Sequence, residues 1–399
     1  MTQQLPDYQL IETEDALELF YEANKNVSWL AFDTEFMGEK RYETLLCLVQ
    51  VATENGYYLL DSIRLPHLDP FLQLVEDQSI TKITHAGDND YRLLHSLYGT
   101  IPQNIFDTQL AAGFVGYKYP VSFRKLVETE LNIRLSKGYA VANWESRPFQ
   151  QKQLKYALND VVPLYELWER LGKKLAQKNR TDWAEDEVNK LTQSKYYKRD
   201  PYHEVLKSNM IKSLSQREQF FLMRLYEWRR AQAEKKNYSK EMILPSKIIG
   251  QIVRSIRSGK HALQQNRRIP SKLAERNGDT FVQLYEAEPT DEERAVLKRL
   301  PRGRSQENPY QELIVDMLNL LVRFKCLDNN ISPSLVMPRT LAKELQLNPK
   351  LKDFQLLEGW RRAFLGEELI NWLEHRERLV IDMSGGTVEM KLRQLTTEG

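Results

Sequence analysis

Four carboxylates and one phenol in the first 160 residues have types and spacings that suit catalysis. Asp33 and Glu35 lie two residues apart on a predicted strand, so their side chains point to the same side of a sheet and can share a cation. The apolar run 30–32 predicts a buried strand, so acids that continue it must lie at its end or face a polar cleft. Tyr156 and Asp160 lie four apart on a predicted helix and therefore share one face. Either pair alone is commonplace, as exposed acids at a strand end or as a core-edge tyrosine beside a solvated acid.

The fourth acid, Asp90, follows a predicted strand at 81–87 and lies in the first turn of the next helix. A carboxylate there can also cap the helix, because it satisfies free amides and the macrodipole. Asp88 directly precedes the helical run, so we predict that Asp88 is the cap and that Asp90 faces the sheet. Asp107 is predicted to cap the following helix or to support the site. His85 ends a buried strand and is predicted to be a hydrogen-bonded core residue outside the site.

These residues depend on a mixed α/β scaffold. Short apolar runs rich in β-branched residues alternate there with helical periodicity. The Asn-Gly pair at 55–56 predicts a hairpin turn, and the strands around it are expected to form an antiparallel meander. Pro163 predicts a kink inside the last helix. The predicted strands are 28–36, 45–53, 56–62, 81–87 and 104–107, and the predicted helices are 67–77, 88–99, 122–132 and 151–177.

The length of 399 residues indicates two or three domains, because single hydrophobic cores stop growing at roughly 250–300 residues. From 178 to 212 the sequence becomes polar and charged, and strand signals almost vanish beyond it, so we place a domain boundary there. Region 213–290 has helical periodicity, and a second helical region follows a charged linker that contains proline and glycine. In these two regions Pro245 and Pro338 each precede an amphipathic helix, which suggests related folds.

The composition is that of an ordinary globular protein, with 41% hydrophobic and 28% charged residues. No segment approaches the roughly 18 consecutive apolar residues of a membrane span. The first 15 residues are acidic and lack the basic and apolar regions of a signal peptide. Cys47 and Cys326 lie in apolar surroundings far apart in the sequence, which favours reduced core thiols over a disulfide framework or a zinc site. We therefore expect a cytoplasmic protein.

Charge is distributed unevenly along the chain. Residues 1–200 contain 23 Lys and Arg against 29 Asp and Glu, a net charge of −6, whereas the remaining residues contain 34 against 26, a net charge of +8. This asymmetry suggests that the basic half binds a polyanion and that the acidic half holds cations. An uneven solvated surface explains the charges equally well, since the pI of 8.2 is below the value of about 9 expected of a dedicated nucleic-acid domain.

The combination of motifs is more specific than any one of them. FDTEF (32–36), HAGDND (85–90) and YALND (156–160) have the order and approximate spacing of the three exonuclease motifs of the DEDD superfamily, in its tyrosine-bearing subclass. The sequence resembles the ribonuclease D family over nearly its whole length. The resemblance includes IFDTQLAA (105–112), the segment 143–161 and two downstream helical regions similar to HRDC domains, the second recognised mainly by position, by its proline motif and by FQLLEGWRRAFLGEELINWL (354–373).

This resemblance implies a ribonuclease-H-like α/β exonuclease domain, with a mixed sheet flanked by helices, over residues 1–190. It also implies an all-α HRDC domain at 213–290 and a second HRDC-like domain at 308–385. The activity implied is 3′-5′ exoribonuclease, releasing nucleoside 5′-monophosphates from RNA 3′ ends and serving in tRNA 3′ processing. The implied partners are RNA 3′ ends, with tRNA precursors as the substrate class. Chains of this kind with tandem HRDC domains can act alone, which is consistent with a monomer.

The family pattern also implies roles for the candidate site residues. Two divalent cations, Mg²⁺ or Mn²⁺, would be held by Asp33, Glu35, Asp90 and Asp160, since hard cations prefer oxygen ligands. Two such ions about 3.5–4 Å apart supply both an attacking hydroxide and stabilisation of the leaving 3′ oxygen. Asp33 is expected to bridge the ions. Tyr156 is expected to orient the attacking water, because an ordinary tyrosine pKa of about 10 makes it a poor base at neutral pH.

Further residues are candidates for contacts with RNA. Trp144 and Arg147, in the loop before the helix that carries Tyr156 and Asp160, have types that stack on bases and contact phosphates of single strands, although loop packing explains them equally well. The basic helix that starts near residue 215 is a candidate guide for RNA, with protein contact or simple solvation as alternatives. It carries Arg224, Arg229, Arg230, Lys235 and Lys236.

Two other functions are compatible with parts of the pattern. A DNA-directed exonuclease of the same superfamily would use the same acids, and only activity on matched RNA and DNA strands would separate it from an exoribonuclease. A non-catalytic nucleic-acid-binding module is the other alternative, and the presence of all four acids and the tyrosine argues against it.

Overall fold

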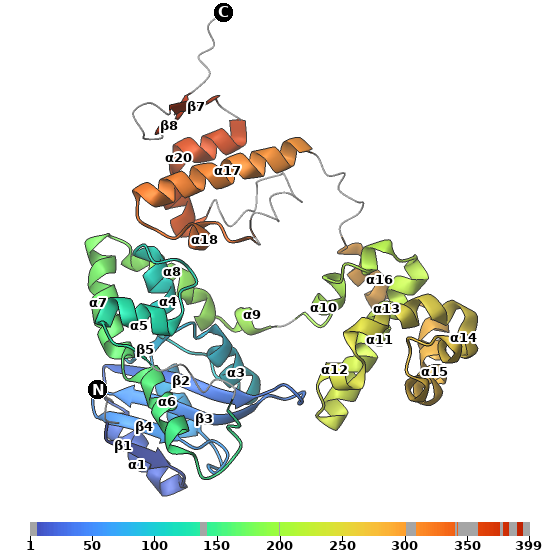
Figure 1. Cartoon of the computed structure of the whole chain (residues 1–399), viewed down its shortest axis with the longest axis horizontal. Helices are drawn as coiled ribbons and strands as arrows, with labels where there is room; N and C mark the ends of the chain where they lie inside the picture. The colour runs from blue at the N-terminus through green and yellow to red at the C-terminus, as the bar shows by residue number, and fades with distance from the viewer. Residues whose placement is uncertain are drawn as a thin grey trace, which may run out of the picture. The chain divides into compact units, whose positions relative to one another are not determined.

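The computed structural model describes residues 6–135, 142–198, 200–300, 309–339, 341, 358–375, 378–382 and 389–393. The chain forms two compact units (Figure 1). The first contains residues 1–35, 48–197 and 304–399, and the second contains residues 36–47 and 198–303. The predicted second HRDC-like region, 308–385, therefore groups with the first unit, and parts of it lie outside the described residues.

A six-stranded mixed sheet with the order β1-β4-β3-β2-β5-β6 forms the core of the first unit. Strands β3 and β4 pair antiparallel, with Thr53 opposite Gly56, so the hairpin turn lies where the Asn-Gly pair predicts it. The pairs β1–β4, β2–β5 and β5–β6 are parallel. The strands are β1 (Tyr8–Ile11), β2 (Trp29–Met37), β3 (Leu45–Thr53), β4 (Gly56–Leu60), β5 (Thr81–Thr84) and β6 (Ile105–Asp107).

One face of this sheet packs against two helices near the end of the predicted exonuclease domain. Ala31 of β2 and Ala52 of β3 share a buried apolar cluster with Val161 and Leu164 of these helices. Proline has no N–H group to continue the helical ladder, so the segment predicted as one kinked helix is divided into two at Pro163. The two helices are α6 (Gln151–Val161) and α7 (Leu164–Gln177).

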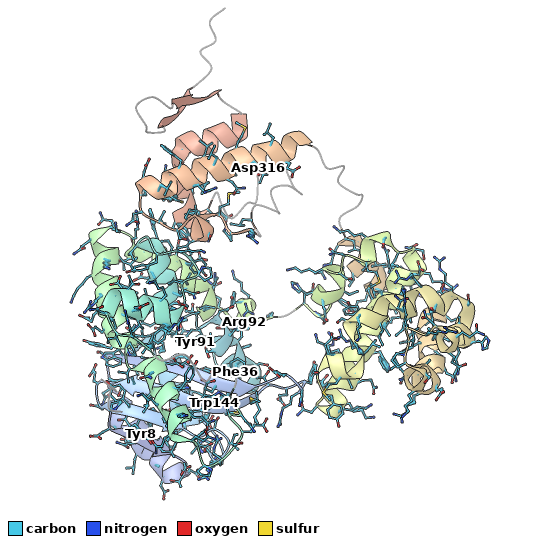
Figure 2. The ribbon with its side chains drawn as sticks, viewed as in Figure 1. Tyr8, Phe36, Tyr91, Arg92, Trp144 and Asp316 are labelled. Carbon is cyan, nitrogen blue, oxygen red and sulfur yellow. The ribbon has the colours of Figure 1, made fainter. Side chains whose placement is uncertain are left out.

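The opposite face is covered by helices from earlier in the chain. Phe32 of β2 packs edge-on against the rings of Phe71 and Tyr91, with centroid distances of 5.6 and 5.5 Å. Figure 2 labels Tyr91 on its helix in the first unit. The helices before α6 are α1 (Glu14–Asn24), α2 (Asp69–Glu76), α3 (Asp88–Tyr98), α4 (Thr108–Phe114) and α5 (Phe123–Leu131).

The C-terminal region docks on the exonuclease part of the first unit. Trp360 packs edge-on against Phe114 and stacks on Trp183, at centroid distances of 4.7 and 6.0 Å. The Trp360 Nε1 and Arg361 Nη1 groups both donate to Glu187, at 3.0 and 2.8 Å. The elements involved are α8 (Thr181–Val188), α17 (Pro309–Asp328), α18 (Pro333–Val336) and α20 (Gly359–His375). An antiparallel pair that the sequence did not predict follows them, β7 (Arg378–Asp382) with β8 (Glu389–Arg393).

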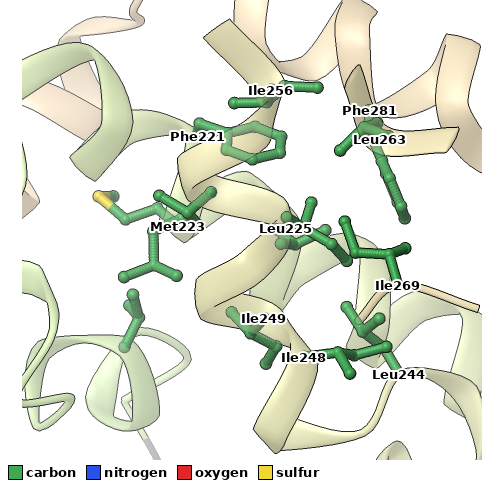
Figure 3. Close-up of a cluster of buried hydrophobic side chains, with 14 of the residues drawn as sticks. Phe221, Met223, Leu225, Leu244, Ile248, Ile249, Ile256, Leu263, Ile269 and Phe281 are labelled. Atoms are coloured by element: carbon green, nitrogen blue, oxygen red, sulfur yellow. The ribbon is translucent and has the colours of Figure 1, made fainter. Parts of the chain in front are cut away.

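The part of the second unit from residue 198 onward is helical, as the loss of strand signals beyond residue 212 predicts. Its core gathers large apolar side chains from all its longer helices, including Phe221, Leu225, Ile249 and Phe281 (Figure 3). Helix α13 begins directly after Pro245, as expected. The helices of eight or more residues are α11 (Gln216–Lys236), α13 (Ser246–Ser255), α15 (Ser271–Glu286) and α16 (Asp291–Lys298); the shorter ones are α10 (His203–Leu206), α12 (Lys240–Ile243) and α14 (Gly259–Gln265).

Candidate active site

Three of the predicted acids meet at the surface between β2 and α6. Asp33 and Glu35 alternate with Ala31 along β2, so they lie on the face that α6 covers. Asp160, in the last turn of α6, faces them from the helix. Carboxylate oxygens of these three residues lie within 4.8 Å of one another. Residues 125 or more apart in the sequence are thus brought to one point by the packing of the catalytic helix on the sheet.

The fourth acid approaches from the opposite side of β2. Asp90 lies in the first turn of α3, is 8% exposed, and accepts a hydrogen bond from the hydroxyl of Thr34. The charge of Asp90 acts on Asp33 and raises its pKa, which places the two carboxyl groups in one electrostatic site. Sequence reasoning missed Thr34. The available signal was its position between two acids on a strand, where its side chain must point to the face that carries α3.

The predicted cap of α3 was wrong. The N-cap residue is Gly87, and no side chain caps the helix. Asp88 is already the first helical residue, so its carboxylate reaches along the helix to Arg92, which donates from Nε at 3.0 and 3.1 Å. It also accepts from the hydroxyl of Tyr196 at 2.6 Å. The choice of Asp90 rather than Asp88 for the site agrees with this geometry.

Asp107 and His85 hold the loop that leads into α3. Asp107 caps α4 by accepting from the amides of Gln109 and Leu110, and it also accepts from the amides of Ala86 and Gly87 at 3.2 and 2.9 Å. His85 Nε2 donates to the carbonyl of Val121 at 3.1 Å, while its Nδ1 lies 2.9 Å from Thr108 Oγ1. Burial lowers the pKa of His85. Both residues therefore support the site from outside it, as predicted.

Tyr156 lies one helical turn before Asp160 and forms a hydrogen bond with it. Burial raises the pKa of the phenol well above its ordinary value, and the nearby charges of Asp160, Glu35 and Asp33 raise it further. The hydroxyl therefore stays protonated at any physiological pH. It can donate a hydrogen bond and orient a neighbour, but it cannot take a proton as a base.

The four carboxyl groups share an unusual electrostatic state. Burial is the largest cause of a raised pKa in each case, and repulsion from neighbouring acids adds to it at Asp33 and Glu35. The pKa is well above its usual range for Asp33, about 8 for Glu35, about 6 for Asp90 and about 7 for Asp160. No Lys or Arg is among the groups that shift these four pKa values. These acids are therefore held partly in their neutral forms, and a bound cation would favour their ionised forms.

The donor set fits a hard divalent cation. It consists of carboxylate oxygens alone, without sulfur or imidazole, which suits Mg²⁺ or Mn²⁺ rather than softer metals. Asp160 Oδ2 is buried and has no hydrogen-bond partner among the described residues. Buried polar atoms are normally satisfied, and a bound ion would satisfy this one.

Gln50 is a second buried polar group on the same face of the sheet. It alternates with Ala52 on β3, so it lies on the side of the sheet that carries Asp33 and α6. Its side chain is fully buried, and neither amide atom has a hydrogen-bond partner within the described parts of the chain. Sequence reasoning missed Gln50, because a single glutamine in an apolar strand is compatible with either face of a sheet.

The two residues predicted to contact RNA have other roles in the structure. Trp144 is 1% exposed and packs near Phe149 and Tyr156, so neither face of its indole is open to a base. Arg147 donates to both carboxylate oxygens of Asp61, which is fully buried, and lies over the ring of Phe149. Both side chains therefore pack the loop that precedes α6, which is the alternative to a substrate contact.

The basic helix α11 also differs from its prediction. Arg224 is buried and forms an ion pair with Glu293, at 2.5 and 2.7 Å. Arg229 is 2% exposed and pairs with Glu204 and Glu241. These two arginines hold the helical domain together and do not present charge to RNA. Lys235 and Lys236, at the end of the helix, are exposed.

Comparisons with known proteins agree with this geometry. Residues 8–176 match a family model described as 3'-5' exonuclease, and residues 220–285 match the HRDC domain. A ribonuclease D of Desulfotalea psychrophila is 30% identical over 366 residues, which cover 88% of this chain and 95% of that protein. The chain belongs to the ribonuclease D family.

Other members of the family match over similar lengths. A ribonuclease D of Gluconacetobacter diazotrophicus is 28% identical over 380 residues, covering 94% of this chain and 95% of that one. The crystal structure of Escherichia coli RNase D, described as an exoribonuclease involved in structured RNA processing, has the same fold, with a TM-score of 0.80, 24% identity and coverage of 92% and 99%. All three predicted exonuclease motifs lie within the matched residues 8–176. Within the described parts of the chain, no helix is both long and apolar enough to cross a membrane.

Proposed function

We propose that this chain is a metal-dependent 3′-5′ exoribonuclease that shortens RNA from its 3′ end, with tRNA precursors as its substrate class. The observation that carries the proposal is the gathering of Asp33, Glu35, Asp90 and Asp160 in one buried site of a 3′-5′ exonuclease domain. Membership of the ribonuclease D family supports RNA as the substrate. The net charge of +8 beyond residue 200 is consistent with a polyanionic partner.

Each acid has a distinct place in the proposed site. Asp33 is the member whose carboxylate feels the charges of all three others, so it is the residue placed to be shared between two cations. Glu35 and Asp160 would complete one cation site, and Asp90, held by Thr34, would contribute to the other. Bound divalent cations supply an activated water and stabilise negative charge on the leaving oxygen.

Tyr156 has a positioning role in this proposal. Its protonated hydroxyl lies beside Asp160 and the β2 acids, so it can donate to an oxygen held in the cluster and fix its direction of approach. In-line attack on a phosphodiester depends on such alignment, which contributes strongly to catalysis when the reacting atoms are held about 3–3.5 Å apart. The products would be nucleoside 5′-monophosphates, and the enzyme would act in the cytoplasm as a monomer.

The test is a time course on a 3′-extended tRNA beside a single-stranded DNA of matched length, each with Mg²⁺, with Mn²⁺ and with chelator. We expect a ladder that shortens from the 3′ end of the RNA only when metal is present. Faster shortening of the DNA would favour the DNA-directed alternative. Binding of RNA without shortening under any metal condition would favour a non-catalytic module.

A further inference from the structure

A cavity of about 630 Å³ lies where the C-terminal region meets the exonuclease part of the first unit. Its walls come from the segment after α4, from the second half of α17, and from the turn and helix α18 that follow. This volume lies in the range of about 300–1,000 Å³ that is typical of ligand sites. It contains none of the four acids described above, so it is a separate feature of the molecule.

The lining of this cavity has one sign of charge. Lys118, Arg323 and Arg339 line it, and no aspartate or glutamate is among the described residues of its walls. All three are exposed to solvent, and no ion pair or hydrogen bond joins them to another residue that the structure describes. Neutral polar side chains, including Asn319 and Ser334, lie between them. Three positively charged side chains around one concavity, without an acidic partner among the described residues, focus a positive potential, although the first 200 residues carry a net charge of −6.

The cavity walls are held firmly together by hydrogen bonds across the domain junction. The Ser332 amide donates to the carbonyl of Gly113 at 2.9 Å, and the Ser332 hydroxyl accepts from the amide of Tyr119 at 2.9 Å. Arg180 donates to the carbonyls of Phe114, Asn330 and Asn329 at 2.6, 3.1 and 2.5 Å. The positions of the basic side chains therefore depend on a fixed junction. A ligand that binds there loses less free energy to ordering of the protein.

Backbone geometry makes the junction still closer at Gly116. This residue has φ +107°, and a Cβ atom there would lie 2.1 Å from the side-chain oxygen of Asn330. Only glycine allows the two segments to approach so closely. The buried thiol of Cys326 forms part of the wall, and burial raises its pKa to about 12, so it offers no thiolate for chemistry.

The wall of the cavity is also connected to the active-site scaffold. Lys118 precedes Val121 by three residues, and the carbonyl of Val121 accepts from His85, at the start of the loop that leads to Asp90. Both sites therefore depend on the segment 115–121. A polyanion that occupied the cavity would be held by the same rigid frame that positions the acids.

We propose that this cavity, with Lys118, Arg323 and Arg339, binds backbone phosphates of the RNA substrate away from the 3′ end being cut. The proposal rests on the proposed function, because it takes RNA as the substrate. Phosphates are the ligands that unpaired lysines and arginines bind with charge-assisted hydrogen bonds. The cavity would thus retain the body of a structured RNA while the single-stranded 3′ end enters the acidic site.

The test is the salt dependence of RNA binding by the full chain in chelator, so that no RNA is cut. The probe is an RNA hairpin with a single-stranded 3′ extension, and the variant is Lys118→Ala/Arg323→Ala/Arg339→Ala. Each lost phosphate contact should reduce the slope of log K against log salt by about 1, so we expect a reduction of about 2 to 3. The matched control is Lys25→Ala/Lys173→Ala/Lys178→Ala, which removes the same charge from exposed positions of the same unit and should leave the slope within about 1 of the parent.

Two further measurements separate the possible outcomes. Cleavage of a four-nucleotide RNA with Mg²⁺ should be unchanged in the cavity variant, since none of the four acids lines the cavity. The charge-preserving variant Lys118→Arg/Arg323→Lys/Arg339→Lys should restore most of the slope. If the triple alanine variant does not fold, Lys118→Ala and Arg323→Ala are measured singly, each with an expected slope reduction of about 1.

An unchanged slope in the cavity variants, or an equal change in the control, would overturn the proposal. It would also be overturned if inorganic phosphate stabilised the parent and not the variant against heat while hairpin binding stayed equal, because the cavity would then hold a small anion. Failure of the proposed function is detected by a separate measurement, the shortening of RNA by the parent chain. In that case the parent would not shorten RNA with metal, whatever the salt slopes of the variants.

Discussion

The helical core of the second unit and the acidic site of the first unit both bury charge, but they do so in opposite ways. In the second unit Arg224 is buried against Glu293, and Arg229 against Glu204 and Glu241. Although burial alone would raise it, the pKa of Glu293 is held below its ordinary value by Arg224 and by the Thr290 amide. In the acidic site, burial raises the pKa of every acid, and repulsion from the neighbouring acids adds to it at Asp33 and Glu35.

This difference distinguishes charged groups that stabilise the fold from charged groups that bind a ligand. A buried pair is complete within the protein, and its removal exposes the partner to an uncompensated desolvation cost. A buried group of like charges is incomplete until a cation binds, so it destabilises the metal-free fold and gains free energy from the ligand. The comparison predicts opposite consequences of neutralising one member in each region.

The largest expected effect is on catalysis, from Asp33→Asn. Loss of the carboxylate that interacts with all three other acids should lower kcat by about 10³-fold or more, since groups that act as a unit fail together. Because one repulsive charge is removed, the metal-free variant should unfold at or above the parental temperature. The measurements are single-turnover RNA cleavage and thermal unfolding in chelator, with the exposed Asp182→Asn as control. Parental cleavage rates in Asp33→Asn would show that the site is wrongly assigned.

The next largest effect is on stability, from Arg224→Met in the second unit. This change leaves Glu293 buried without its partner and should reduce the free energy of unfolding by about 3–5 kcal/mol. Cleavage of a four-nucleotide RNA should persist, because the acids lie in the other unit. Urea unfolding measures the loss, and Lys235→Met on the same helix, at an exposed position, is the control. The double variant Arg224→Met/Glu293→Leu should recover much of the loss, and no recovery would contradict the pairing argument.

Sequence reasoning predicted local structure and the acid motifs better than it predicted which distant side chains form ion pairs. The strand at 45–53 was predicted with its observed bounds, because an apolar β-branched run ends there at a turn signal. Strand β1 was missed, since Tyr8–Ile11 is short and has only one buried residue. Its place beside β4 depends on tertiary pairing over about 50 residues.

The same limit explains the errors in side-chain roles. Arg224 and Arg229 were predicted as surface charges because their partners lie elsewhere in the sequence, 69 residues away for Glu293. For Trp144 the sequence left base stacking and loop packing open, and its buried ring next to Tyr156 agrees with packing. The acids themselves were identified because three motifs recur in a fixed order, which a sequence displays directly.

The third prediction concerns the pH dependence of the metal-free protein. Acids with a raised pKa in the folded state stabilise it below their unfolded pKa of about 4, and this contribution is lost as pH rises through the folded values. Those values are about 6 for Asp90, about 7 for Asp160 and about 8 for Glu35. We therefore expect the Tm in chelator to fall between about pH 5 and pH 8.

Metal should reverse this trend, because cations bind the ionised acids. Added Mg²⁺ should raise the Tm strongly at pH 8 and little at pH 5, and Asp33→Asn should flatten the pH dependence. The paired acid Glu293 has a lowered pKa, so it contributes stability above its unfolded pKa and loses it as pH falls toward its folded value. A metal-free Tm that rose from pH 5 to pH 8 would contradict repulsion among the acids.

The smallest expected effect concerns a buried polar group without charge, Gln50. An unsatisfied buried amide costs about 1–3 kcal/mol, and an apolar side chain of similar size removes that cost. Gln50→Leu should therefore raise the free energy of unfolding by about 1 kcal/mol in chelator. Gln9→Leu is the matched control, because it makes the same exchange at an exposed strand position and should change stability by less than about 0.5 kcal/mol.

The activity of Gln50→Leu then decides whether this residue serves ligand binding, like the acids, or only packing of the fold. Gln50 shares its sheet face with Asp33, as the alternation along β2 and β3 requires. If the amide is kept for a ligand, as the acids are, the stabilised variant should also show a lower kcat/KM with Mg²⁺ and a smaller rise in Tm on adding Mg²⁺. A stabilised variant with parental activity would make Gln50 a packing residue alone, while a destabilised one would show that the amide has a partner within the fold.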